Sequence, residues 1–291
     1  YSFEITNIII TLVKNLKDNS NFFQANLLLA IDSLKKGDYK SSEQYINRSY
    51  ELINNDRFSL IIAEIFKEYL YVFNEKKIPK SKKKFGNFSY INEVFQRCYL
   101  GDQSTKTYFK RLINSQNDAD YSRYAFFFVN YLIESEKYDE AKQITDDFDY
   151  LNSSLLISQG KKWIEDRKFK NFLDIFSCTN SSDIMGEFFF LVANLYSSQG
   201  DYEKSNFYLN ISNYLNPKFT LNLSLLAENY YTNEDYENTK KTLEVFDKTN
   251  EFYYWFKIKK EAQIISNNLD KDVSLKFINS KFRGIKNPTR K

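Results

Sequence analysis

The chain has 291 residues, and its 42% apolar content is ample for a folded core. The 41 basic and 38 acidic residues nearly cancel to a net charge of +3, which argues against a nucleic-acid surface along the whole chain. No apolar run reaches the ~18–20 residues that a transmembrane helix needs, and the sequence has no histidine, the commonest general base and metal ligand. We therefore expect no catalysis, no cofactor and no metal site.

The first recognisable unit spans residues 23–56. Its apolar residues recur with the 3.6-residue period of a helix, and the pair Gly37-Asp38 separates two such segments. Glycine accepts the left-handed conformation at a helix end, and aspartate caps the start of the following helix. The segment therefore predicts a helical hairpin, that is, two antiparallel helices joined by a tight turn.

Residues 57–120 predict irregular helix pairs, interrupted by a basic stretch that Pro79 and Gly86 mark as a loop. This loop could contact the phosphates of nucleic acid or of an anionic membrane. The alternative is an ordinary solvated loop, which we favour because no stacking aromatic residues alternate with the lysines. The candidate anion-binding residues are Lys76, Lys77, Lys80, Lys82, Lys83 and Lys84.

Residues 122–151 predict a second clear hairpin, followed by a more divergent unit in which we expect Gly160 at the turn. Residues 186–219 form the clearest unit. There Ala193 is small enough for close helix contact, Gly200 ends the first helix, Asp201 caps the second and Pro217 stops it. The many aromatic residues, 18% of the chain, fall at helical spacing and are expected in the core rather than along a binding groove.

The strongest signal is a repeat of 34 residues. Residues 220–253 repeat the preceding unit, although Glu234 stands where the turn glycine is expected. A fixed period of this length is typical of a solenoid built from stacked helical units. A last unit runs from Phe252 to about Phe282, and we see no dedicated polar cap at either end of the chain. The residues that recur are Ala193, Tyr196, Asp201 and Tyr202, as Ala227, Tyr230, Asp235 and Tyr236.

This pattern resembles the tetratricopeptide repeat (TPR) family, in the style of long bacterial TPR proteins of proteobacterial type. The resemblance implies an all-α fold, an α-α superhelix in which TPR-like helix-turn-helix repeats form a right-handed solenoid. It also implies a single domain over residues 1–291 with about 7–8 hairpins, which we expect to be a fragment of a longer protein. The clearest repeats are 23–56, 122–151, 186–219 and 220–253, and the irregular part is 57–120.

In this family the first helices of the repeats line a concave face, where partner peptides usually lie. The resemblance therefore implies a groove with asparagine side chains for the peptide backbone and aromatic rings for its side chains. The alternative is that these residues are merely exposed polar groups and minor apolar contacts. The groove residues that the repeat register implies are Phe126, Asn130, Ile157, Lys161, Phe190, Asn194, Glu228 and Tyr231.

These observations favour a noncatalytic scaffold for a protein or peptide partner of unknown identity. One alternative is an accessory region of a larger bacterial envelope-assembly protein or enzyme, and another is nucleic-acid or membrane binding through the lysine loop. We expect no small-molecule substrate, and a location in the bacterial cytoplasm or in the periplasm. Cys98 and Cys178 belong to no CxxC motif and are expected to be buried, inert thiols.

Overall fold

The computed structural model describes residues 21–53, 56–80, 85–114, 122–150 and 153–283, together with the single residue Thr11. Within these ranges the fold is all-helical, with fifteen α-helices, one short 3-10 helix and no strand. Helices that follow one another in the chain pack as pairs. The all-α expectation is therefore confirmed over the described ranges.

The helix bounds are α2 (Phe23–Lys35), α3 (Tyr39–Glu51), α4 (Arg57–Glu75), α5 (Asn87–Tyr99), α6 (Thr105–Ile113), α7 (Ser122–Glu134), α8 (Tyr138–Asp146), α9 (Leu155–Glu165), α10 (Lys170–Ile175), α11 (Ser181–Ser198), α12 (Tyr202–Leu215), η2 (Thr220–Asn222), α13 (Leu223–Thr232), α14 (Tyr236–Leu243), α15 (Glu251–Asn268) and α16 (Lys271–Arg283).

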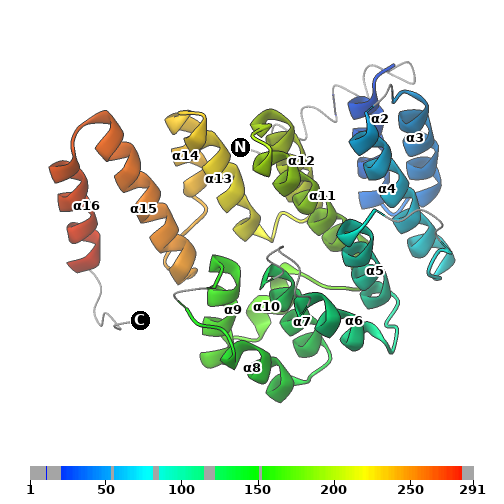
Figure 1. Cartoon of the computed structure of the whole chain (residues 1–291), viewed down its shortest axis with the longest axis horizontal. Helices are drawn as coiled ribbons and strands as arrows, with labels where there is room; N and C mark the ends of the chain where they lie inside the picture. Colours follow the sequence, from blue (N-terminus) through cyan, green and yellow to red (C-terminus); the bar gives the residue numbers. More distant parts are fainter. Residues whose placement is uncertain are drawn as a thin grey trace.

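Four of the hairpins lie side by side in what we call the hairpin row: α2/α3, α11/α12, α13/α14 and α15/α16 (Figure 1). Within the row α12 packs against both α2 and α13, and α14 packs against α15. Helix α4 packs on α3 and leads out of the row to α5. Helices α5–α10 then form a lower layer beneath the row, in which α7 contacts α6, α8, α9 and α10 (Figure 1).

The hairpins consequently do not stack in chain order. In a linear solenoid each repeat contacts only its neighbours in sequence. Here the Tyr214 hydroxyl of α12 donates to Asp32 of α2 at 2.8 Å, across 182 residues of chain. Residues 57–180 leave the row after the first hairpin and return at α11, so the second hairpin of the row packs on the first.

A shared packing device joins the two helices of each hairpin in the row. A buried alanine in the first helix is followed, twelve residues later, by a buried serine or threonine in the second. The Ser42 and Ser274 hydroxyls each donate at 2.7 Å to the backbone oxygen of their alanine. Small side chains at both positions let the helices approach closely. The four pairs are Ala30–Ser42, Ala193–Ser205, Ala227–Thr239 and Ala262–Ser274.

An aspartate precedes the second helix in every hairpin of the row. Each carboxylate accepts a hydrogen bond from the backbone N–H three residues further on, at 3.0 Å for Asp38, 3.1 Å for Asp201 and Asp235, and 2.7 Å for Asp270. These bonds satisfy amide groups that lack a partner within the helix. The predicted cap at Asp201 is confirmed.

The turn before α14 has the geometry of a glycine turn without the glycine. Gly200 at the end of α11 has φ +77°, and Glu234, at the corresponding place after α13, has φ +60°. Equivalent backbone hydrogen bonds close both turns. For example, the Asp201 N–H donates to the Tyr196 oxygen in the first turn, and the Asp235 N–H donates to the Tyr230 oxygen in the second. The left-handed conformation costs a residue with a Cβ about 1–2 kcal/mol. Glu234 is therefore held in a strained conformation by the hairpin.

Replacing Glu234 by glycine is expected to raise the free energy of unfolding by about 1 kcal/mol, because relief of this strain exceeds the extra backbone entropy of glycine in the unfolded chain. Urea denaturation of the two proteins measures the change. The matched control is Asn233→Gly, since Asn233 has an ordinary φ of −83° and glycine there brings no relief. Equal effects of the two substitutions would contradict this interpretation.

Aromatic residues make up much of the core, as expected, although Phe22, Tyr71, Tyr138 and Phe282 are exposed. In helix α7 every residue from Tyr124 to Ile133 is buried except the half-buried Tyr131, which is typical of a helix covered on all sides. The prediction for Gly160 is wrong, because this residue lies inside α9 and is buried rather than at a turn. A Cβ there would lie 3.0 Å from Cδ2 of Phe126, so the glycine makes room for that ring.

Candidate functional site

A cluster of polar side chains joins the first helices of two adjacent hairpins, α13 and α15, and includes the first residue of α14. We call it the α13–α15 cluster, and it consists of Glu228, Tyr231 and Tyr236 with Lys260 and Asn267. Two of these five residues, Glu228 and Tyr231, are predicted groove residues. The cluster is therefore where part of the expected binding face is brought together.

Lys260 is the centre of the α13–α15 cluster. Its Nζ lies 2.6 Å from a carboxylate oxygen of Glu228 and 4.2 Å from the centre of the Tyr231 ring. The lysine is only 7% exposed, whereas the side chain of Glu228 is 40% exposed. A buried ammonium group needs such partners, and the ring face and the carboxylate supply them.

The outer end of the cluster is formed by two tyrosine hydroxyls and an amide. Nδ2 of the exposed Asn267 donates to the hydroxyls of Tyr231 and Tyr236, at 3.3 and 3.1 Å. Both tyrosines are half-buried and their rings lie 5.9 Å apart. Rigid aromatic rings with a polar tip beside an amide and an ion pair can hold a peptide through apolar and hydrogen-bond contacts.

A further hydrogen bond between polar side chains connects α13 to the preceding hairpin at α11. The Ser197 hydroxyl donates to Oδ1 of Asn229 at 2.7 Å, which links α11 to α13. On the same helix α11, the predicted groove residue Asn194 is exposed. Polar side chains thus link α11 to α13 through Ser197 and Asn229, and α13 to α15 through Glu228 and Lys260.

The other predicted groove residues lie elsewhere. Phe126 and Asn130 are fully buried, Ile157 is 1% exposed and Phe190 is 9% exposed, so these four side chains line no open surface. The expectation that these four residues line the groove is therefore wrong. The physical reason is that α7 and α9 are packed inside the lower layer, and this layer also covers one side of α11. Lys161 is half-buried and donates to the Phe148 backbone oxygen at 2.6 Å.

Asn130 has a structural role within the core. Its Nδ2 donates to the backbone oxygens of Phe172 at 2.9 Å and Phe176 at 3.1 Å, which fastens α10 and the following segment to α7.

The sequence did not predict that Lys260, Tyr236 and Asn267 belong to the α13–α15 cluster. The run Lys257, Lys259 and Lys260 contains no signal that shows which lysine turns toward α13.

A buried ion pair connects the lower layer to the row. Arg123 of α7 makes two bonds to the Glu187 carboxylate of α11, at 2.8 and 2.6 Å, and a third at 2.7 Å to Oδ1 of Asn222. Its guanidinium lies 3.7 Å from the centre of the Phe190 ring. The side chain of Glu187 is only 2% exposed, and this burial raises the pKa of its carboxyl group, which the nearby Arg123 opposes.

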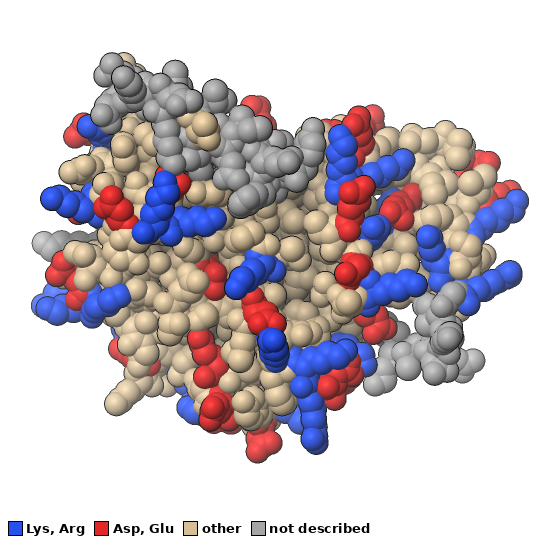
Figure 2. All heavy atoms as spheres, turned by 180° about the vertical axis from the view of Figure 1, so that it is seen from behind, with Lys and Arg blue, Asp and Glu red and all other residues tan. Residues whose placement is uncertain are grey.

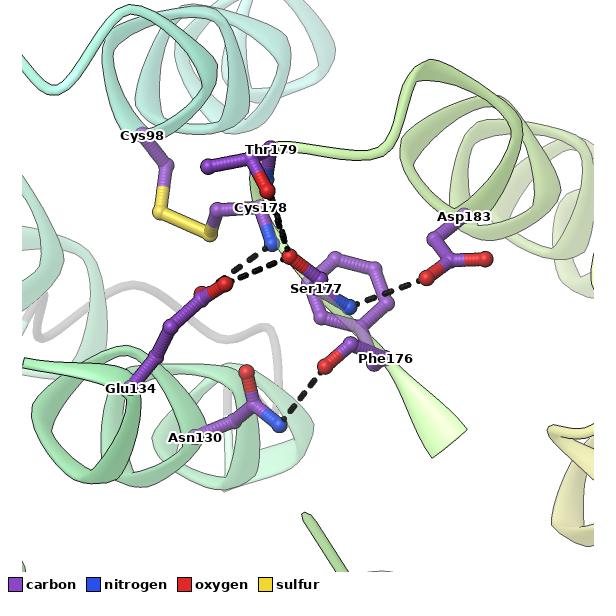
Figure 3. The surroundings of a disulfide bond; sticks show 8 residues. All are labelled: Cys98, Asn130, Glu134, Phe176, Ser177, Cys178, Thr179 and Asp183. Atoms are coloured by element: carbon purple, nitrogen blue, oxygen red, sulfur yellow. Dashed lines mark hydrogen bonds between the residues drawn. A yellow bond between two sulfur atoms is a disulfide. The ribbon is translucent and has the colours of Figure 1, made fainter. Parts of the chain in front are cut away.

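A second connection between the layers is covalent. Cys98, near the end of α5, forms a disulfide with Cys178, in the segment between α10 and α11, and both are almost fully buried (Figure 3). The expectation of burial is confirmed, but the expectation of inert thiols is wrong. Eighty residues separate the two cysteines in sequence, so only the return of the chain from the lower layer to α11 brings them together.

Two carboxylates hold the backbone beside this disulfide. Glu134 of α7 accepts from the Ser177 hydroxyl at 2.5 Å and from the Cys178 N–H at 3.3 Å, and Asp183 of α11 accepts from the Ser177 N–H at 3.0 Å (Figure 3). Burial raises the pKa of Asp183 to about 6, an effect that the Ser177 N–H and Lys218 oppose and the charge on Glu134 adds to.

Because the pKa of Asp183 is raised by folding, the native chain binds this proton more tightly than the unfolded chain, and stability falls as the pH rises between about 4 and about 6. The substitution Asp183→Asn removes this loss. We expect its stabilising effect, measured by urea denaturation, to be about 2 kcal/mol larger at pH 7.5 than at pH 4.5. Asp174→Asn, which removes a charge on an exposed part of α10, is the control. A pH-independent difference would contradict the prediction.

The candidate anion-binding lysines form no described cluster. Lys82, Lys83 and Lys84 lie outside the described residues, while Lys77 and Lys80 are exposed. Lys76 ends α4 and donates to the Tyr99 hydroxyl at 2.5 Å. Figure 2 shows basic and acidic side chains interspersed over one face of the molecule, with uncharged areas between them. This face therefore presents no extended field of one sign.

Comparison of the chain with protein-family models, with curated proteins and with solved structures finds no match. Within the described ranges, none of the helices combines the length and the apolar character of a membrane span. The same ranges contain no group of three or more aspartate, glutamate, histidine or cysteine side chains arranged to hold a metal ion.

Proposed function

We propose that this chain is a noncatalytic scaffold of TPR-like helical hairpins, which continues as a right-handed superhelix along the hairpin row and binds a protein or peptide partner. The observation that carries the proposal is the α13–α15 cluster. It presents Glu228, Tyr231 and Asn267 on the first helices of successive hairpins, beside the exposed Asn194 of α11. Repeated alanine–hydroxyl pairs and aspartate caps support a common repeat unit along the row.

The chemistry of the cluster suits an extended peptide better than a small molecule. Tyrosine rings offer large contact area with little loss of side-chain entropy, and they are enriched among residues that dominate binding energy. The part-exposed carboxylate of Glu228 and the amide of Asn267 can pair with a peptide backbone or with a basic side chain. The buried Lys260 fixes the positions of Glu228 and Tyr231, so part of the contact geometry exists before binding.

The test uses a displayed library of random twelve-residue peptides, selected against the full chain with its disulfide intact. Selected peptides are expected to bind Tyr231→Ala at least tenfold more weakly, equal to about 1.4 kcal/mol of binding energy. Tyr71→Ala is the control, because Tyr71 is 43% exposed on α4 and lies outside the cluster. Selected peptides that bind the two variants equally, or a selection that yields no specific peptide, would contradict the proposal.

The disulfide favours one of the two expected locations. Disulfides persist in oxidising compartments and are rare in the cytosol, where thiols are kept reduced. Cys98–Cys178 therefore supports a scaffold that works in a compartment such as the bacterial periplasm, in line with the envelope-assembly alternative. Mass determination of the protein from its native source, with and without thiol alkylation, tests this: two alkylated cysteines would contradict it.

A further inference from the structure

The disulfide lies where the lower layer joins the row. The chain leaves the row through α4, enters the lower layer at α5, and returns at α11. Cys98 is the last residue but one of α5, and Cys178 lies three residues before α11. The bond therefore closes the neck of the inserted segment, and every helix from α6 to α10 belongs to the loop that it closes.

Three helices hold the segment between α10 and α11. Helix α7 holds it through Asn130 and Glu134, and α11 holds it through Asp183 (Figure 3). On the third side, α5 holds it by the covalent bond and by the contact of Phe95 with Phe176, whose rings lie 6.0 Å apart. Loss of the bond would leave the segment fastened to α7 and α11 but would weaken its attachment to α5.

The bond lies beside an exposed stretch of chain. Cys178 itself is 2% exposed, but the next two residues, Thr179 and Asn180, are exposed and belong to no helix. The row also has contacts that do not depend on the neck, such as Asp32 with Tyr214 and Asn229 with Ser205.

We propose that the Cys98–Cys178 bond is a redox-operated clasp, which holds α5 to the segment between α10 and α11 when oxidised and loosens that attachment when a dithiol reduces it. One thiolate of the dithiol attacks Sγ of Cys178 and forms a mixed disulfide, and Cys98 leaves as a thiolate that takes up a proton. The second thiol of the dithiol then attacks its own bound sulfur and releases Cys178. Two electrons and two protons pass to the cysteines, and the dithiol becomes a cyclic disulfide.

Hydrogen–deuterium exchange of the full chain tests the clasp. The oxidised protein is compared with protein reduced by dithiothreitol, in which titration verifies two free thiols. We expect exchange of the protected amides in α5–α10 to become at least tenfold faster on reduction, while α13 and α14 keep their protection. The double variant Cys98→Ser/Cys178→Ser is expected to match the reduced protein and to ignore dithiothreitol.

Three outcomes would overturn the proposal. Unchanged exchange in α5–α10 after verified reduction would show that the bond locks nothing. Loss of protection in α13 and α14 as well would show that the bond supports the whole fold rather than one layer. A bond that millimolar dithiothreitol leaves intact under native conditions would show that it is not redox-operated. None of these readouts depends on peptide binding, so the clasp and the scaffold proposal fail independently.

Discussion

Replacing Glu187 by alanine is expected to lower the free energy of unfolding by about 3–5 kcal/mol. The substitution leaves the Arg123 guanidinium largely buried, with Asn222 and three phenylalanine rings, Phe127, Phe190 and Phe219, as its remaining described partners. An unpaired buried charge has lost its hydration without a compensating carboxylate. Urea denaturation at neutral pH measures the change from the shift in midpoint.

A double substitution distinguishes the loss of the pair from the loss of one partner. In Arg123→Met/Glu187→Leu both charges are replaced by apolar side chains of similar length, and the desolvation of charge disappears together with the attraction. We expect this protein to recover most of the stability that Glu187→Ala loses. If the double variant is as unstable as Glu187→Ala, the hydrogen bonds between α7 and α11, rather than the unpaired charge, account for the effect.

Replacing Phe126 by alanine is expected to destabilise the fold by about 3–5 kcal/mol, the usual cost of removing a buried phenylalanine. This residue is fully buried, with its ring stacked on Phe172 at 5.2 Å between centroids and on Phe219 at 5.9 Å. Thermal and urea unfolding measure the effect. Phe22→Ala, at a side chain that is 50% exposed, is the control, and we expect it to change stability by less than about 0.5 kcal/mol.

A substitution at Gly160 tests the packing around the Phe126 ring independently. In the wild-type protein a Cβ on Gly160 meets the Phe126 ring, so Gly160→Ala sets a gain in helix propensity of about 1 kcal/mol against a steric clash. In the Phe126→Ala background the ring is absent and the clash disappears. We therefore expect Gly160→Ala to be more favourable there than in the wild type. Equal effects in both backgrounds would contradict the packing described for these two residues.

The local structure could be predicted from the sequence wherever the determinants lie within one hairpin. The cap at Asp201, the turn at Gly200 and the helical type of every described element depend on neighbouring residues, and a single sequence contains that information. Gly160 shows the limit, because a glycine in a repeat register can serve a turn or a close contact. Only the position of Phe126 in space decides between the two.

The candidate site could be predicted only in part, because it depends on how hairpins meet. The repeat register assumes that units stack in chain order. That assumption identified Glu228 and Tyr231 on α13, yet it also placed Phe126 and Asn130 on an open groove, where the structure has a covered helix. The disulfide depends on the same long-range arrangement. Nothing near Cys98 or Cys178 in the sequence indicates that residues 57–180 return to their starting point.

The contact between Asp32 and Tyr214 has a consequence for synthesis of the chain on the ribosome. Helix α2 emerges 182 residues before the tyrosine that completes its packing. At a translation rate of ~5–20 residues per second, the apolar side of the first hairpin waits roughly 10–40 s for α12 to emerge. During that interval it is a target for chaperones or for a neighbouring nascent chain, so the order of translation, and not only the final packing, bears on the yield of native protein.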